Sequence, residues 1–340
     1  MRICTKLALV TGIAALCTSA LATAQSAPPG TAPVVIKTIW SMGTNSLMGF
    51  GATKFKEIVE KKSAGRIVVE LFPNNSVSGG SNPAAIQLVK ANTIQMTQQS
   101  PDQLSNLVPE LGVISLPFLF STREQAHKIV DGPMGQELLK QLEGQDLVGI
   151  SFWELGFRQF SNKRREVSKP EDMKGLRVRV SEGGVKGATI RALGATPVAV
   201  PGPEIYMSLQ TGVVDGQETP ANVFASFKLW EVQSHFTKWN YVWDATIVLF
   251  SKQFLDGQTP ENRQVIIDSV KEATALQRAE YVRAEEVAEK LLIERKVKVT
   301  TLTPEQIRPF RDAAQVVYTT TAPKTMPPAL IERWTKAASQ

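Results

Sequence analysis

The sequence predicts an α/β protein of two lobes, each a mainly parallel sheet flanked by helices, with one long helix spanning both lobes. Strand and helix patterns alternate in two separate series, which predicts two such sheets. The apolar run at residues 241–250 is long enough for a strand that passes between lobes. Neither glycine nor proline occurs from residue 261 to residue 303, and a helix of about 35 residues there would be about 50 Å long, longer than either lobe.

The first series has the order strand, helix, strand, helix, strand, which is typical of a parallel sheet with helices on its faces. Pro73 and a polar loop containing Gly79-Gly80 end the second strand. Pro83 is a favourable first helical residue after an asparagine cap. The five elements are a strand at 34–40, a helix at 47–62, a strand at 66–72, a helix at 84–91 and a strand at 93–97.

The second series follows a mixed segment and leads into the long helix. Thr259-Pro260-Glu261 is a strong helix start, because a capping hydroxyl, a proline and an early acid occur together, and Thr303-Pro304-Glu305 repeats the pattern. The elements are strands at 147–153 and 176–180, a helix at 187–193, a strand at 196–200, a helix at 205–210, a strand beginning at Val213, the long helix to about residue 295 and a strand at 297–300.

The N-terminal 24 residues have the pattern of a Sec-type signal peptide. Arg2 and Lys6 supply the basic segment, and residues 7–16 form an apolar run too short for a stable membrane span. Ala22-Thr23-Ala24 is a small-x-small cleavage signal, so we expect cleavage after Ala24. A flexible leader should occupy residues 25–33 of an exported protein.

The composition argues against several classes of protein. Cys4 and Cys17 both lie in the predicted signal peptide, so the mature chain has no disulfide and no cysteine nucleophile or metal ligand. Removing Arg2 and Lys6 leaves 36 of the 38 Lys and Arg residues against 32 Asp and Glu, a net charge of +4. No arginine-rich run is interleaved with aromatics, so we expect no nucleic-acid partner.

Motifs for metal and cofactor chemistry are missing from the sequence. His127 and His235 lie far apart in helical stretches and make a poor metal site. No nucleophile elbow, phosphate loop or zinc-protease motif occurs, and no apolar stretch after residue 24 is long enough to cross a bilayer. We therefore expect no cofactor, no metal and no enzymatic activity.

The strand at 176–180 is the leading candidate for a ligand site, because it carries two arginines. A guanidinium group can hold a carboxylate with two parallel hydrogen bonds, and a strand holds that group rigidly. Ligands of parallel α/β sheets sit outside the carboxyl ends of strands, which favours Arg179 as the carboxylate ligand. Alternation puts Arg177 and Arg179 on the same face, so the pattern does not say which one is buried. The alternative role is a solvated charge at the strand edge.

Arg158 is the second candidate, because it lies where one lobe should pass into the other. It fits a ligand contact and a hinge salt bridge equally well, with Glu154 as the structural partner. Asp215 and Glu218 should orient the segment around Thr219 by hydrogen bonding, since an anion site does not favour their charges on the ligand.

Five further candidates lie near the ends of the predicted strands. Trp40 and Trp243 have rings that could stack on a ligand, although aromatics at strand ends are more often core residues. Asn82, Gln99 and Ser100 fall in loops on the expected cleft side, where the same residue types also serve in turns and caps.

A set of short motifs, in order along nearly the whole mature chain, resembles one family. Each motif is weak alone, and their number and order make the combination specific. They lie at residues 65–73, 115–120, 131–135, 153–158, 172–180, 192–197, 209–218 and 230–233. By these motifs the sequence resembles the solute-binding proteins of tripartite ATP-independent periplasmic (TRAP) transporters, the DctP-like family.

The resemblance implies a periplasmic-binding-protein fold that closes around a ligand. The lobes would be residues 34–156 with 245–284, and residues 157–244 with 285–338. It also implies a periplasmic receptor, which we expect to be a monomer, that delivers a small organic acid to the membrane subunits of a TRAP permease driven by a sodium gradient.

The resemblance also implies roles for single residues. In the family the arginine matching Arg179 clamps the ligand carboxylate, and the one matching Arg158 often assists. Thr219 stands where asparagine is commoner, and Gly202 stands where many relatives carry an aromatic that covers the ligand. Because of these two departures the contacts of other members cannot be carried over in full. The substrate stays open among dicarboxylates, sugar acids, 2-oxo acids and aromatic acids, since all of these satisfy one arginine clamp.

Two alternative functions use the same features. A receptor that presents its ligand to a sensor kinase would have the same binding chemistry. An exported lyase or isomerase would need an acid and a base facing the cleft, for which the sequence offers Glu154, Asp215, Glu218 and Tyr206.

Overall fold

The computed structural model describes residues 32–181 and 184–340, so the predicted signal peptide and most of the predicted leader lie outside the described residues. The described strands form one sheet in the order β2-β1-β3-β8-β4-β7-β5-β6, with β9 paired to β8. The strands are β1 (Val34–Ile39), β2 (Ile67–Phe72), β3 (Met96–Gln99), β4 (Leu147–Asn162), β5 (Arg177–Val180), β6 (Thr196–Ala199), β7 (Gly216–Thr219), β8 (His235–Ser251) and β9 (Lys298–Thr301).

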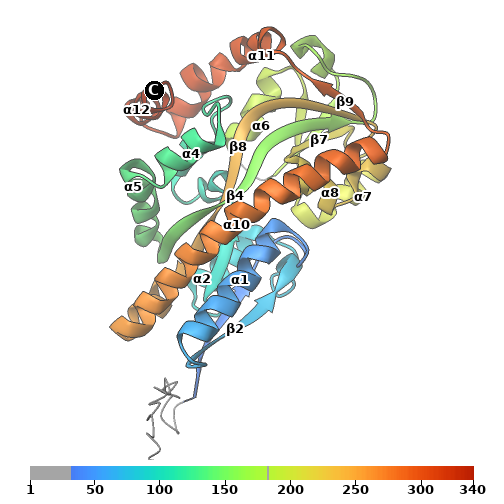
Figure 1. Cartoon of the computed structure of the whole chain (residues 1–340). Coiled ribbons are helices and arrows are strands. Elements are labelled where there is room, and N and C mark those ends of the chain that lie inside the picture. The colour runs from blue at the N-terminus through green and yellow to red at the C-terminus, as the bar shows by residue number, and fades with distance from the viewer. Residues whose placement is uncertain (1–31, 182–183) are drawn as a thin grey trace, which may run out of the picture.

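Two long strands, β4 and β8, connect two parallel groups of strands. Strands β2, β1 and β3 pair in parallel on one side, and β7, β5 and β6 pair in parallel on the other. Strand β8 runs antiparallel to β3 and to β4, and β4 runs antiparallel to β7. Figure 1 shows β4 and β8 side by side through the middle of the molecule.

Strands β4 and β8 are longer than the sequence pattern predicts. The expected strand at 147–153 continues to Asn162, and the expected strand at 241–250 begins at His235. The β4–β8 register shifts three times, and Gly156 lies in one of these irregular stretches with φ +99°. A Cβ at Gly156 would lie 2.3 Å from the Tyr281 ring, so only glycine lets the strand and the long helix approach this closely.

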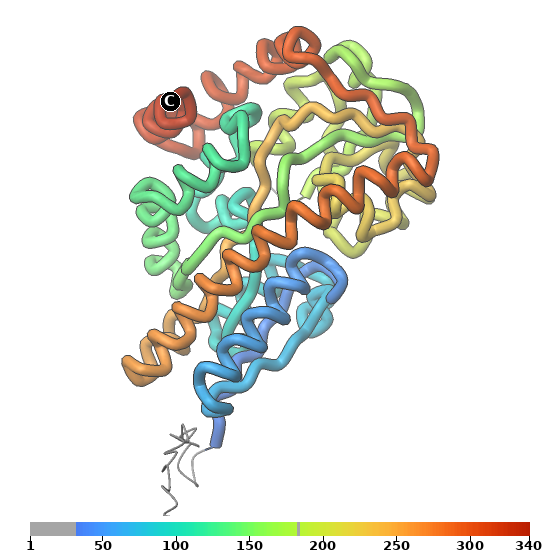
Figure 2. Tube along the Cα trace, in the orientation of Figure 1, coloured from blue at the N-terminus to red at the C-terminus, as the bar shows by residue number. Residues whose placement is uncertain are grey.

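Helices cover the sheet, and one of them extends along both strand groups. Figures 1 and 2 show α10 crossing the molecule, past α1 and on to α8, which it also contacts. The helices are α1 (Leu47–Lys62), α2 (Asn82–Lys90), α3 (Pro101–Leu104), α4 (Arg123–Val130), α5 (Pro133–Gln141), α6 (Gly184–Ala192), α7 (Ile205–Gln210), α8 (Ala221–Ser226), α9 (Lys252–Asp256), α10 (Pro260–Glu294), α11 (Pro304–Val316) and α12 (Pro328–Ala337). The predicted α/β class and the long helix are confirmed. The predicted lobe boundaries stay a prediction.

Each strand group packs on its own apolar core. Beside β1–β3, Phe55 of α1 and Val270 of α10 are buried against the sheet. Beside β5, Trp239 and Tyr241 of β8 pack with Phe310 of α11. Within the described residues, no helix has both the length and the apolar character needed to cross a bilayer.

Candidate functional site

A cavity of about 70 Å³ lies where the two strand groups meet. Its walls come from both groups of strands and from β4, β8 and α6. The lining residues are Ser41, Met42, Met48, Asn82, Gln98, Ser100, Gln103, Leu155, Arg158, Arg179, Ser181, Lys186, Gly202, Ile205, Thr219, Val223, Phe227, Asp244 and Thr246.

Strand ends supply much of this lining, as expected for a ligand site in a parallel α/β sheet. Ser41 follows β1, Ser100 follows β3 and Ser181 follows β5. Thr219 is the last residue of β7, and Gly202 lies shortly after β6. Five of the eight predicted site residues therefore line one cavity: Arg179, Arg158, Thr219, Asn82 and Ser100.

Arg179 is buried at the cavity end of β5, with 3% of its surface exposed. Its Nε donates a 2.8 Å hydrogen bond to the backbone oxygen of Val200, which orients the guanidinium group. Arg177 lies on the same face of the strand, but its side chain is 44% exposed. The structure thus decides which of the two arginines belongs to the cavity.

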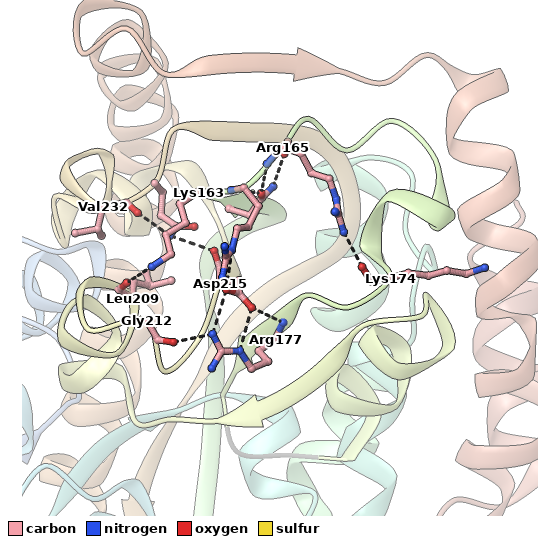
Figure 3. A network of polar contacts seen from close by, with 11 residues as sticks. Lys163, Arg165, Lys174, Arg177, Leu209, Gly212, Asp215 and Val232 are labelled. Carbon is pink, nitrogen blue, oxygen red and sulfur yellow. Dashed lines mark hydrogen bonds and ion pairs between the residues drawn. The ribbon is translucent and has the colours of Figure 1, made fainter.

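Arg177 instead belongs to a surface network around Asp215, shown in Figure 3. Its Nε donates to Asp215 Oδ2 at 3.0 Å, and Arg164 Nη2 donates to Asp215 Oδ1 at 2.9 Å. The hydrogen bonds from Arg177 hold the pKa of Asp215 well below its usual range, against the effect of burial. Asp215 does not line the cavity. Its hydrogen bonds with Arg177 connect the loop before β7 to β5.

Arg158 is the centre of a buried cluster of charges beside the cavity. Arg158 Nη2 donates to Glu218 Oε1 at 2.8 Å, and Arg158 also forms an ion pair with Asp244. Lys186 Nζ lies 3.2 Å from the other oxygen of Asp244, and the Tyr241 hydroxyl donates to Glu218. Two cations and two carboxylates thus balance one another out of contact with water, which a stable buried cluster requires.

The pKa shifts of Arg158 and Asp244 favour the ionised forms of these two groups. Burial opposes the charge of Arg158, but Glu218 and Asp244 outweigh it and raise the pKa of Arg158 well above its ordinary value. Burial likewise opposes the charge of Asp244, while Lys186 and Arg158 lower its pKa on balance.

The predicted pairing of Arg158 with Glu154 is wrong. Glu154 accepts two 2.7 Å hydrogen bonds from Arg123, which comes from α4. Glu154 lies four positions before Arg158 on β4, but the pairing register between β4 and β8 shifts between these two residues. Glu218 accepts hydrogen bonds from Arg158 and Tyr241, and its expected effect on the segment around Thr219 stays a prediction.

Sequence reasoning did not single out Lys186, Asp244, Gln98, Ser181 or Thr246 as site residues. Lys186 is fully buried, although a lysine in a helix is usually a solvated charge. Asp244 carried a signal that was available: it is the one acidic residue in the apolar run 241–250. A buried strand tolerates such a group only when it is paired or has a function.

Several polar residues of the cavity lining have a buried atom without a hydrogen-bond partner among the described residues. The atoms are Gln98 Oε1, Ser181 Oγ, Thr219 Oγ1 and Thr246 Oγ1, all buried. The other two predicted polar residues in the cavity lining already have partners, since Asn82 Oδ1 accepts from Asn75 and Ser100 caps α3. Buried polar atoms without partners are rare and often mark a ligand or water position.

Trp40, Gln99 and Trp243 lie outside the cavity lining. Trp40 is fully buried in the core behind Met42 and Met48. Trp243 packs edge-on against Phe120 and donates Nε1 to Glu154 Oε1 at 3.1 Å. Gln99 points to the opposite side of β3 from Gln98 and donates to Thr97.

Asp102 is a further charged residue next to the cluster. It is fully buried, and neither carboxylate oxygen has a hydrogen-bond partner among the described residues. Burial raises the pKa of Asp102 to about 6; Lys186 opposes this shift, and Glu218 and Asp244 add to it. In the parts of the chain that the structure describes, no group of three or more metal-binding side chains is found.

The chain is similar in sequence and structure to bacterial solute-binding proteins. A sequence model described as "Bacterial extracellular solute-binding protein, family 7" matches residues 39–324. The chain is 32% identical over 269 residues to the 2,3-diketo-L-gulonate-binding periplasmic protein of Escherichia coli K12, a match that covers 79% of this chain and 78% of the relative.

Solved structures of the same kind share the fold. A sugar acid binding protein of Advenella mimigardefordensis in complex with galactonate superposes with a TM-score of 0.87 at 31% identity, over 90% of this chain and 98% of that one. A TRAP periplasmic solute binding protein of Shewanella oneidensis with bound succinate gives a TM-score of 0.86 at 29% identity, over 90% and 100%.

Proposed function

Because this chain belongs to the bacterial extracellular solute-binding proteins of family 7, the DctP family, and is a solute-binding protein rather than an enzyme, we propose that it is a periplasmic receptor for an organic acid. It would bind the acid in the cavity between the strand groups and deliver it to the membrane subunits of a TRAP permease. The observation that carries this proposal is Arg179, a buried guanidinium at the cavity end of a strand. Relatives with bound acids, galactonate in one and succinate in another, support the ligand class.

Arg179 would hold the ligand carboxylate, and Arg158 would support the site without contacting the carboxylate. The guanidinium of Arg158 is already engaged by Glu218 and Asp244, so its part is to fix the charges around the site. The cavity is lined from both predicted lobes, with Ser41 and Asn82 on one side and Arg179 and Thr219 on the other. A ligand that contacts both would favour the closed arrangement through its higher affinity for that state.

The test of this role is Arg179→Ala against a matched control. A buried charge pair broken on one side costs about 2–5 kcal/mol, so the affinity for the acid should fall at least tenfold. Arg177→Ala is the control, because Arg177 lies two positions earlier on the same face but is exposed and pairs with Asp215. Calorimetry that gives equal affinities for the wild type and Arg179→Ala would refute the carboxylate role.

The natural ligand can be sought by thermal-shift screening of organic acids, since a ligand that binds only the folded state raises the melting temperature. Uptake by cells with and without the permease then tests delivery. If cells that lack this protein lose a sensor-kinase response to the acid but still take the acid up, the signalling alternative is indicated instead. Export would be tested by sequencing the N-terminus of the periplasmic protein, which should begin at Gln25 after removal of residues 1–24.

A further inference from the structure

Asp244 gives the cavity a built-in carboxylate. It lines the cavity from the middle of β8 with 2% of its surface exposed. One of its oxygens pairs with Arg158 and the other with Lys186, at 3.2 Å for the lysine. Asp244 therefore occupies the place, relative to these two cations, that a second carboxylate of a ligand would need.

A second ligand carboxylate would be unfavourable beside Asp244. Lys186 is buried among protein atoms and already paired, and Arg158 is paired with Glu218 as well. A dicarboxylate would bring like charges together in a site that excludes water, where repulsion is stronger than in solution. An ammonium group would gain little, because Arg158 and Lys186 already balance the charges of Glu218 and Asp244.

Gln98 shows what kind of group the ligand presents instead. Gln98 Nε2 donates a 3.1 Å hydrogen bond to the backbone oxygen of Met48, which leaves Oε1 as a buried acceptor. A carboxylate has no proton to donate to this acceptor, whereas a hydroxyl group has. A ligand without hydroxyls would leave Gln98 Oε1 buried and unpaired.

The other three cavity atoms without partners fit the same chemistry. The hydroxyls of Thr219, Thr246 and Ser181 can each donate to or accept from a hydroxyl of the ligand. Thr246 lies two positions from Asp244 on the same face of β8, so these two side chains meet one region of the cavity. Asp244 and Gln98 can accept from ligand hydroxyls there.

We infer that the ligand is a polyhydroxy monocarboxylate, a small acid with one carboxylate and several hydroxyl groups, and that Asp244 excludes a second carboxylate. This inference rests on the proposed function, because it takes the cavity as the place where the acid binds. The carboxylate lies toward β5, and the hydroxyls contact Asp244, Gln98 and Thr246. Site preferences of this kind are strong, since a site built for hydroxyls rejects analogues that leave its polar groups unpaired.

The test uses sets of four acids of equal chain length that differ only in their hydroxyl groups and in the presence of a second carboxylate. At four carbons these are D-erythronate, meso-tartrate, butanoate and succinate, and at six carbons D-galactonate, galactarate, hexanoate and adipate. The hydroxylated monocarboxylate should bind at least tenfold more tightly than the other three acids of its length. Equal or tighter binding of the hydroxylated dicarboxylate overturns the role of Asp244. Equal binding of the plain monocarboxylate overturns the hydroxyl contacts.

Failure of the proposed function itself looks different. If no organic acid binds, the receptor proposal falls, and if acids bind equally well to Arg179→Ala, the carboxylate role of Arg179 falls. If acids bind through Arg179 without the preference above, only the present inference falls.

Variants locate the preference in the named residues. Asp244→Asn should shift the ratio of galactonate to galactarate affinity at least tenfold toward galactarate. Without the carboxylate of Asp244, Arg158 and Lys186 can pair with the second carboxylate of the ligand. Gln98→Met tests the same inference without touching the charge cluster. It should lower the affinity for galactonate at least fivefold and leave that for hexanoate unchanged, and an unchanged ratio would contradict the inference. Gln99→Met is the control, because Gln99 is equally buried in β3 but lies outside the cavity lining.

Discussion

Replacing Asp102 with asparagine should stabilise the protein at neutral pH. Asp102 is fully buried, and its pKa rises from 3.8 to about 6 on folding. Between these two values the folded protein binds more protons than the unfolded chain, so ionisation of Asp102 removes stability as pH increases. A shift of that size corresponds to about 3 kcal/mol above pH 7, since one pKa unit is about 1.4 kcal/mol.

Asp102→Asn cannot ionise, and so it should be more stable than the wild type by about 3 kcal/mol at pH 7.5 and by about 1 kcal/mol at pH 4.5. Urea unfolding at both pH values measures this difference. Comparing variant with wild type cancels the titration of Asp215, whose lowered pKa acts in the opposite direction. Asp312→Asn, an exposed change of the same charge on α11, is the control.

The stability difference between Asp102→Asn and the wild type should not stay constant between the two pH values or grow as pH falls. Either outcome would refute a raised pKa of Asp102. Either result would mean that Asp102 is already ionised at low pH or that Lys186 compensates its charge fully. The four charged groups that act on Asp102 are Lys186, Glu218, Asp244 and Arg158.

Two further predictions concern backbone geometry and the surface network. Gly156→Ala should cost about 2 kcal/mol or more in unfolding free energy, because a side chain at φ +99° is strained and would meet the Tyr281 ring at 2.3 Å. Gly144→Ala, where a Cβ meets nothing within 4 Å, should be neutral in the same unfolding assay, and equal effects at both positions would contradict this account. Asp215→Asn should cost about 1–2 kcal/mol at pH 7, a value reduced by the exposure of Arg177. Because the pKa of Asp215 is depressed on folding, this difference should begin to shrink below about pH 4; a pH-independent difference in urea midpoints would count against the ion pairs.

The order of elements could be predicted from sequence because apolar periodicity and capping patterns are local signals. Thr259 caps α10 and Ser81 caps α2, close to the predicted helix starts. The second half of β4 could not be predicted, because Glu154 and Arg158 look like loop residues and are buried only through partners far away in sequence. His127 was expected in a helical stretch and lies in α4, but no bounds were predicted for α4 or α5, which lack a long periodic pattern. The helical placement of His235 is wrong, because His235 is the first residue of β8.

The site was predictable to the extent that strand ends and the family resemblance point to it. Arg179 was favoured by its position on the strand, and the structure places it in the cavity. Whether it contacts the ligand stays a prediction. Lys186 and Asp244 could not be found from spacing, because they pair across 58 positions and only the fold brings them together.

The shared strands β4 and β8 limit how the protein can be divided. Strand β8 pairs with β3 of one group, β4 pairs with β7 of the other, and the two strands pair with each other along their length. A fragment cut between the groups would expose bare strand edges and lose the core on one side, which promotes aggregation. Attempts to express either half alone should therefore yield insoluble chains, and a split reporter or a domain insertion is better placed at the exposed Gly144, in the short 3-10 helix Leu142–Gln145.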